Sequence, residues 1–377
     1  MSLKYANQLA SNHQTGNVLF SPIKDILLIP SNNLLSAIDL KTYTQCSLKT
    51  KTKFDISVQE ISPCGKFLAI VDEFNKIYIL SLAGTQAGSL LGSYQVTKKH
   101  GNAKITTLKF SNSGQLAVAS SSILILYDIP VIRNPKNLTP NCIKLIRVYN
   151  EMKSHSEITC LSWSDDDSSL LVGNENGQSM IFSAIRTNKN LKSRLVLNRL
   201  AGNDRGKIVF GKILKDGRVL VVASNKMARI YERIFNYDDE EDQETEDQIK
   251  KNEVTNIKKE NVTSTKFVPL SKIGNPDQSE RNSSHNNADI NQIITYNLIK
   301  KERLLTDTPV SDVTCCSFHE STGILSVGMK DGSFSLLDVP DFSVINWFGF
   351  RVCILGSVNQ LNQEMSPSYE HTFEKGN

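Results

Sequence analysis

A pattern that recurs six times along the chain limits the possible folds more than any other feature of the sequence. Each copy has an alternating strand, a turn, an apolar strand, a second short turn and another apolar strand that ends near an acidic residue. The copies span Val18 to Leu40, Ile56 to Leu82, Ile105 to Ile129, Ile158 to Ala184, Ile208 to Glu232 and Val313 to Val339. Each copy therefore predicts a small antiparallel sheet.

The spacing of the copies predicts how these sheets assemble. Most copies begin about 40 to 55 residues apart, which is the period of four-stranded propeller blades, and one longer gap precedes the last copy. A single blade cannot bury both of its faces, whereas neighbours stacked in a ring remove those faces from water. We therefore expect an all-β fold, a WD40-type β-propeller with six recognisable blades of an expected seven.

The repeat divides the chain into four parts. Residues 1–236 hold blades one to five, preceded by a lead-in over residues 1–15 that adds an edge strand or packs across the propeller. Residues 237–291 have low hydrophobicity, an acidic run and then many Lys and Asn residues, which predicts a disordered insertion between blades. Blade six occupies 292–345. In the segment 346–377, either a partial seventh blade begins near Arg351 or the sequence lies outside the repeat.

The charge distribution indicates a basic folded body. The run Asp238 to Asp247 contributes −8 to an overall formal charge of +4, so the remainder of the chain carries +12. Basic residues are concentrated in two connections between units. The first is either a phosphate-contacting loop or a solvated pair of lysines, and the second is either a groove for RNA or an acidic partner peptide or a soluble connection. The candidate contacts are Lys98 and Lys99 in the first connection and Arg186, Lys189, Lys192, Arg194 and Arg199 in the second.

No motif for catalysis, a metal or a cofactor stands out. The six histidines are scattered without ligand spacing, and neither a phosphate-binding loop nor a nucleophile elbow is present. The triplet Asp165 to Asp167 lacks the remaining spacing of a calcium loop and predicts a solvated turn. The sequence thus predicts no catalytic residue, no cofactor, no metal and no small-molecule substrate, and hence a protein that is not an enzyme.

The compartment follows from cysteine usage and hydropathy. Seven cysteines form no Cys-x-x-Cys pair, and the adjacent Cys315 and Cys316 point to opposite faces of a strand, so reduced thiols are expected. The sequence contains no run of about 18 apolar residues and no apolar signal core at the N-terminus. We expect a soluble protein in a reducing compartment, without membrane contact.

Taken in order, several segments resemble the periodic tryptophan protein 2 family of WD-repeat proteins. They are Gly16 to Ser21, Lys104 to Pro130, Ile158 to Ser164 and, as the sharpest piece, Val313 to Phe342. The acidic insertion after the fifth unit also fits. The resemblance covers residues 1–345, and the family has two tandem propellers and a C-terminal helical region. The units here never end in Trp-Asp, and the chain ends within or just after the first propeller.

The resemblance implies a non-enzymatic scaffold of the small-subunit processome in the nucleolus. Partners would be other WD-repeat processome proteins, the small nucleolar ribonucleoprotein and precursor ribosomal RNA. The role would be precursor ribosomal RNA processing and small ribosomal subunit biogenesis. Two alternatives remain at this point. One is a general WD-repeat adaptor, such as a ubiquitin-ligase receptor or vesicle-coat component. The other is a propeller hydrolase with carboxylates or histidines converging on the central channel.

Overall fold

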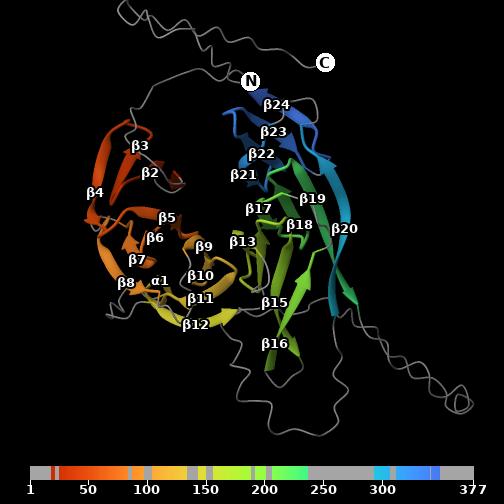
Figure 1. The fold of residues 1–377 in the computed structure, drawn as a ribbon, viewed down its shortest axis with the longest axis horizontal. Helices are drawn as coiled ribbons and strands as arrows, with labels where there is room; N and C mark the ends of the chain where they lie inside the picture. The colour runs from red at the N-terminus through yellow and green to blue at the C-terminus, as the bar shows by residue number, and fades with distance from the viewer. Residues whose placement is uncertain are drawn as a thin grey trace, which may run out of the picture.

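The chain folds into consecutive antiparallel sheets. The computed structural model describes residues 18–21, 25–83, 87–96, 104–133, 143–149, 156–187, 192–200, 206–236, 293–305, 311–339 and 341–348. Within these ranges lie six four-stranded sheets, each built from four strands that are consecutive in the sequence. Figure 1 shows the sheets following one another around a ring, from the red and orange β1–β4 to the blue β21–β24. The predicted all-β propeller with six recognisable blades is confirmed.

The strand bounds are as follows. The first sheet contains β1 (Leu19–Ser21), β2 (Ile26–Ser31), β3 (Leu34–Asp39) and β4 (Gln45–Lys51). The second contains β5 (Ile56–Ile61), β6 (Phe67–Asp72), β7 (Lys76–Ser81) and β8 (Leu90–Gln95). The third contains β9 (Ile105–Phe110), β10 (Gln115–Ser120), β11 (Ile123–Asp128) and β12 (Lys144–Tyr149), with helix α1 (Pro130–Arg133) before β12.

The remaining sheets follow the same order. The fourth contains β13 (Ile158–Trp163), β14 (Ser169–Asn174), β15 (Ser179–Thr187) and β16 (Lys192–Arg199). The fifth contains β17 (Ile208–Ile213), β18 (Val219–Ala223), β19 (Met227–Asn236) and β20 (Ile293–Arg303). The sixth contains β21 (Val313–His319), β22 (Ile324–Met329), β23 (Phe334–Asp338) and β24 (Val344–Phe348).

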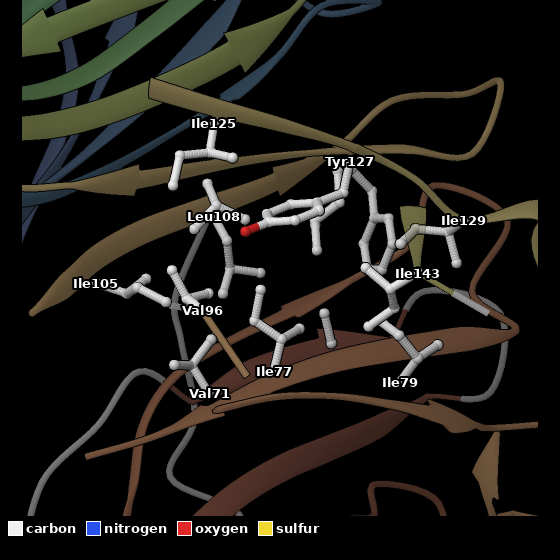
Figure 2. Close-up of a cluster of buried hydrophobic side chains, with 14 of the residues drawn as sticks. Val71, Ile77, Ile79, Val96, Ile105, Leu108, Ile125, Tyr127, Ile129 and Ile143 are labelled. Atoms are coloured by element: carbon white, nitrogen blue, oxygen red, sulfur yellow. The ribbon is translucent and has the colours of Figure 1, made fainter. Parts of the chain in front are cut away.

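Packing between neighbouring sheets forms the core. The first strand of each sheet, here called its inner strand, contacts the inner strand of the next sheet from β1 through β21. Figure 2 shows the apolar cluster between the second and third sheets, where Ile77 and Ile79 face Leu108, Ile125 and Tyr127. All residues of the second strands β6, β10, β14 and β18 are buried. Burial on both faces explains why these strands read as continuous apolar runs rather than as alternating ones.

Hydrogen bonds between sheets add to this packing. The hydroxyls of Thr106 and Thr159 each donate to the carbonyl that begins the next inner strand, Ile158 and Ile208 respectively, at 2.6 Å. The indole N–H of Trp163 donates to the Lys109 carbonyl of the preceding sheet at 3.1 Å. A buried indole N–H needs an acceptor, so this bond fixes Trp163 at the junction of the third and fourth sheets.

The turn from Asp165 to Asp167 differs from its prediction. Asp165 and Asp166 are exposed, as expected, but Asp167 is only 3% exposed. Its carboxylate accepts backbone N–H groups from Asn112 at 2.8 Å and from Ser113 at 2.5 Å in the third sheet. This part of the triplet is therefore a link between sheets rather than a solvated turn.

Three segments that the sequence pattern treats as connections contain outer strands, meaning the fourth strands of their sheets. The polar connection 83–103 contains β8, the connection from Val131 to Lys153 contains β12, and the basic connection after the fourth unit contains β16. Outer strands alternate less clearly because solvent reaches both of their faces. In β4, for example, five of seven residues are exposed.

The insertion interrupts a sheet instead of separating two blades. Strand β20 begins at Ile293, where the sequence pattern resumes, and pairs with β19 along its whole length, from Asn236 with Ile293 to Met227 with Arg303. The start of the segment 292–345, predicted as blade six, thus belongs to the fifth sheet. The interior of the insertion, residues 237–292, lies outside the described residues.

Candidate interaction surfaces

Two outer hairpins are longer than the sheets that carry them. Pairing between β14 and β15 ends at Ser169 and Ser183, whereas β15 continues to Thr187 and pairs with β16 over this extension. Pairing between β18 and β19 likewise ends at Val219 and Tyr231, whereas β19 continues to Asn236 and pairs with β20 over this extension. At about 3.3 Å per residue, each extension projects roughly 13 to 17 Å beyond its sheet. We call these extensions the fourth-sheet ribbon and the fifth-sheet ribbon.

The pairing register gathers three predicted contact residues on the fourth-sheet ribbon. Arg186 pairs with Ser193, Ile185 with Arg194, and Thr187 with Lys192, so Arg186, Lys192 and Arg194 share its end. Arg199 instead pairs with Met180, at the opposite end of β16, roughly 23 Å from Lys192 along an extended strand. Lys98, Lys99 and Lys189 lie outside the described residues. Of the predicted contacts in the second connection that the structure describes, Arg199 thus lies apart from the other three.

The outer strands of the fourth and fifth sheets are neighbours, because β16 contacts β20, and Figure 1 shows both hairpins extending to the same side of the ring. In the body of the fifth sheet, next to the fifth-sheet ribbon, β20 exposes Leu298 and Ile299 together with the basic Lys301 and Arg303. The sequence pattern did not predict the fifth-sheet ribbon, because the pattern of the fifth unit ends at Glu232 whereas β19 continues to Asn236. The residues Arg233 to Phe235 offered a signal, since two of them are apolar and continue the strand.

The described inner strands carry paired charges. Glu60 on β5 forms an ion pair with Lys109 on β9 at 2.5 Å, and Lys212 on β17 forms one with Glu320 at 3.2 Å in the turn after β21. Burial raises the pKa of Glu60, and the Lys109 ammonium opposes this effect. Each pair joins two neighbouring sheets. This arrangement fits a structural link, since each charged group already has a partner.

Burial favours the neutral thiol form of two described cysteines. Burial raises the pKa of the Cys160 thiol to about 11 and also raises that of Cys316, which disfavours the thiolate form. The Nδ1 atom of His319 lies 2.8 Å from the Thr322 hydroxyl in its own turn. Within the described ranges no group of three His, Cys, Asp or Glu side chains could hold a metal ion. Cys46, Cys64, Cys160, Cys315 and Cys316 are free thiols.

A search for membrane-spanning helices gives a negative result. None of the helical structure in the described part of the chain is long and apolar enough to cross a bilayer.

Comparisons with known proteins agree with the fold. The WD domain, G-beta repeat family model matches residues 144–183. This match runs from β12 through Ser183 in β15, so one sequence repeat combines the outer strand of one sheet with three strands of the next. It also includes Ile158 to Ser164, one of the segments on which the family resemblance rests. The β-propeller domain of Myceliophteria thermophila Cps50 (Swd1) superimposes with a TM-score of 0.56 at 14% identity, covering 91% of this chain and 87% of that chain.

The curated relatives confirm the family resemblance. Periodic tryptophan protein 2 of Saccharomyces cerevisiae is 24% identical over 91% of this chain, and that of Arabidopsis thaliana is 24% identical over 92%. The Caenorhabditis elegans homolog is 23% identical over 92% of the chain. The matched regions make up 31%, 38% and 34% of these relatives, so the chain spans about a third of their length. These relatives and the WD-repeat match support a WD-repeat scaffold, which is a type of propeller that binds other proteins.

Proposed function

We propose that this chain, whose curated relatives are periodic tryptophan protein 2 proteins, is a non-enzymatic WD-repeat scaffold of the small-subunit processome. In that role it supports precursor ribosomal RNA processing and small ribosomal subunit biogenesis in the nucleolus. The observation that carries the proposal is the similarity to relatives of this one name over about nine tenths of the chain in yeast, plant and nematode.

The architecture suits such a role. Six rigid sheets present loops and outer strands in fixed positions, and partner-binding residues commonly lie on loops held by a rigid scaffold. The two ribbons add projecting edges to this body. Expected partners are other WD-repeat processome proteins and the small nucleolar ribonucleoprotein.

Direct contact with precursor ribosomal RNA is a separate part of the proposal. It would be made by the fourth-sheet ribbon, where Arg186, Lys192 and Arg194 share one end. Outside the acidic run the chain carries +12, which favours phosphate backbones through release of counterions. Contacts to phosphates do not depend on the nucleotide sequence, and the affinity that they provide falls as the salt concentration rises.

Affinity purification tests the scaffold role. The tagged chain is expressed in its own cells and purified at near-physiological salt, and the bound proteins and RNAs are identified. We expect WD-repeat processome subunits and precursor ribosomal RNA to co-purify. A set of partners without ribosomal RNA contradicts the proposal and leaves the general adaptor, a receptor of a ubiquitin ligase or a component of a vesicle coat, as the function to pursue.

A further inference from the structure

The outer strand β20 exposes apolar and basic side chains at the same place. In the body of the fifth sheet, Leu298 is 37% exposed and Ile299 is 51% exposed, and Lys301 and Arg303 are exposed as well. Charged residues on an edge strand protect it from pairing with other chains, whereas two neighbouring exposed aliphatic residues have the opposite effect. The combination is therefore typical of a contact surface rather than of a protected edge.

A β-bulge arranges these side chains in a row. Three residues of β20 pair with alternate residues of β19, namely Leu298 with Tyr231, Lys301 with Arg229 and Arg303 with Met227. Leu298 and Lys301 are three residues apart, yet they occupy successive positions on one face because the extra residue Ile299 lies between them. Successive positions on one face of a strand are roughly 7 Å apart. Leu298, Lys301 and Arg303 therefore form a row with this spacing.

The row lies on the side of the fourth sheet. Tyr231 on β19 belongs to the buried cluster that joins the two sheets, together with Leu171 and Ile181 of the fourth sheet. Arg229 on the same face of β19 is fully buried and donates to the Gly177 carbonyl, in a turn of the fourth sheet, at 3.1 Å. Directly opposite residues of an antiparallel pair share a face. Their partners on β20 thus border the junction between the fourth and fifth sheets.

Positive charge is concentrated on this side of β20. Lys301 and Arg303 are exposed there, and the guanidinium of Arg229 lies on the same face, one strand further in. On the opposite face of β20, Lys300 forms an ion pair with Glu302 at 3.2 Å. The positive potential is therefore strongest along the row, where it favours an anionic group.

The fourth sheet contributes a hydrogen-bond donor to the same junction. Asn198 on β16 pairs with Ile181, whose side chain lies in the cluster between the two sheets, so Asn198 also faces the fifth sheet. Its strand contacts β20. The Asn198 Nδ2 atom is buried and has no hydrogen-bond partner among the described residues. A buried donor without an acceptor is costly, and an acidic ligand supplies acceptors.

We infer that an extended acidic segment of a partner protein binds across this junction. The junction surface consists of Asn198, Leu298, Ile299, Lys301 and Arg303. An apolar side chain of the segment packs on the two aliphatic residues, and Asp or Glu side chains two and four positions away meet the two cations. One of these carboxylates accepts the Asn198 amide. The inference goes beyond the proposed function, because this surface lies outside the fourth-sheet ribbon and does not depend on the assembly to which the chain belongs.

The chemistry of the junction surface favours a protein segment over RNA. Proteins hold single-stranded RNA by stacking its bases on aromatic rings, whereas Leu298 and Ile299 are aliphatic. Tyr296, the aromatic residue nearest to them along β20, is buried. The exposed carboxylate of Glu302 lies between Lys301 and Arg303 in the sequence, and it repels a continuous row of phosphates.

Fluorescence anisotropy with a labelled peptide tests this inference. The probe is a fluorescein-labelled Glu-Ser-Glu-Ser-Leu-Ser-Glu-Ser-Glu peptide, which presents the pattern in both chain directions, added to the chain of 377 residues. We expect saturable binding that weakens at least about tenfold when the four Glu residues of the peptide are replaced by Gln. Absence of saturable binding overturns the inference. Tighter binding of a labelled uridylate nonamer that is lost on reversal of Lys301 and Arg303 also overturns it, in favour of RNA.

Charge reversal on β20 locates the binding site. Lys301→Glu combined with Arg303→Glu should weaken peptide binding at least about tenfold, because two attractive contacts become repulsive. The control combines Lys49→Glu with Lys51→Glu, two exposed lysines on the outer strand β4, and keeps the affinity of the parent chain. Equal affinities of the two double variants place the peptide elsewhere and overturn the inference. The urea midpoint of each variant verifies that the ring remains folded.

A change on the fourth sheet tests whether the peptide spans the junction. Asn198→Asp preserves the shape of the side chain, removes the amide donor and adds a negative charge, so the affinity for the peptide should fall at least about threefold. Gln45→Glu makes the same change from amide to carboxylate at an exposed position of β4 and leaves the affinity unchanged. Unchanged affinity in the Asn198→Asp variant contradicts binding across the two sheets.

Discussion

Single side chains in turns join neighbouring sheets. The carboxylate of Asp167 in the fourth sheet accepts N–H groups of Asn112 and Ser113 in the third sheet. In the sixth sheet, Glu320 accepts the N–H of Lys215 in the fifth sheet at 2.6 Å. Hydrogen bonds to a charged acceptor contribute more to stability than neutral ones. An acidic residue in a turn therefore links two sheets only where the turn of the neighbouring sheet places backbone N–H groups within reach of its carboxylate.

Replacing Asp167 tests the first of these links. Asp167→Asn removes the charge and one acceptor while keeping a residue that tolerates the positive φ of 58° at this position. We expect the free energy of unfolding to fall by about 1 to 2 kcal/mol in urea denaturation. Asp165→Asn, at an exposed position two residues earlier, is the control and leaves stability unchanged. Equal stability of the two variants contradicts the role given to Asp167.

A buried phenol makes stability depend on alkaline pH. Tyr78 donates to the Asp72 carboxylate at 2.9 Å, and that carboxylate also accepts the N–H groups of Phe74 and Lys76. Burial, followed by the hydrogen bond to Asp72, raises the pKa of Tyr78 from 10 to about 12. Because the folded-state pKa is the higher one, this stabilisation is complete below pH 10 and is lost as pH rises from 10 to about 12.

An ultraviolet titration of the phenols tests this shift. The difference between the parent chain and Tyr78→Phe reports one phenol, which we expect to ionise near pH 12. Tyr43→Phe removes an exposed phenol instead and shows how well the method resolves a single group. Ionisation of Tyr78 near pH 10 in the folded chain contradicts the effect of burial and of Asp72.

At the scale of elements, close contact between sheets depends on small residues. Gly173 in β14 lies against Ile208, the first residue of the next inner strand, and a Cβ at Gly173 would stand 2.5 Å from the Ile208 Cγ2 atom. Ile208 is itself buried and branched at Cβ, so it has little room to move. The contact fixes the distance between the fourth and fifth sheets.

A double-mutant cycle measures this contact. Gly173→Ala is expected to lower the free energy of unfolding by about 1 to 3 kcal/mol through overpacking, and Ile208→Ala by about 2 to 5 kcal/mol through a cavity. The double variant should be less destabilised than the sum of the two by at least about 1 kcal/mol, because the smaller residue relieves the clash. Additive losses in urea denaturation contradict the contact.

Charge reversal on the fourth-sheet ribbon tests direct RNA contact. Replacing Arg186, Lys192 and Arg194 by Glu should weaken RNA retention at moderate salt. It should also lower the slope of log affinity against log salt by about 2, since three phosphate contacts are lost on single-stranded RNA. The control reverses Lys49, Lys51 and Lys53, three exposed lysines of the first sheet and the link after it. Retention unchanged by the ribbon variant contradicts RNA contact at this site.

At the scale of the whole molecule, the ring distributes stability unevenly. The four middle sheets bury both faces of their second strands, whereas the first and sixth sheets each have one open face. In a row of stacked repeats, each unit gains stability from its neighbours. The first and sixth sheets are consequently expected to be the least stabilised units of the ring.

The proposed role also predicts a location for the whole chain. A fluorescent fusion expressed in its own cells should concentrate in the nucleolus, together with a marker of early ribosome assembly. The same fusion carrying Gly173→Ala, which weakens the ring, should accumulate to a lower level without moving to another compartment. A fusion spread evenly through the cytoplasm contradicts the nucleolar role.

The sequence by itself determined the number, order and type of the sheets. Turns between apolar strands are local signals, and segments buried on both faces, such as Leu116 to Ala119, carry a strong pattern. The sequence also placed Cys315 and Cys316 on opposite faces, because alternation along a strand is local. The outer strands β8, β12 and β16 were not recognised, since half-exposed strands keep little hydrophobic pattern.

Only the tertiary structure decided how distant residues meet. It showed that β20 returns to the fifth sheet across the insertion, a pairing set by the ladder with β19 rather than by sequence distance. It separated Arg199 from the other arginines of its connection, and it buried Asp167 against a turn more than 50 residues away. Each outcome depends on which surfaces become neighbours when the sheets stack side by side around the ring. These contacts arise from packing between sheets, so they cannot be predicted from local sequence patterns.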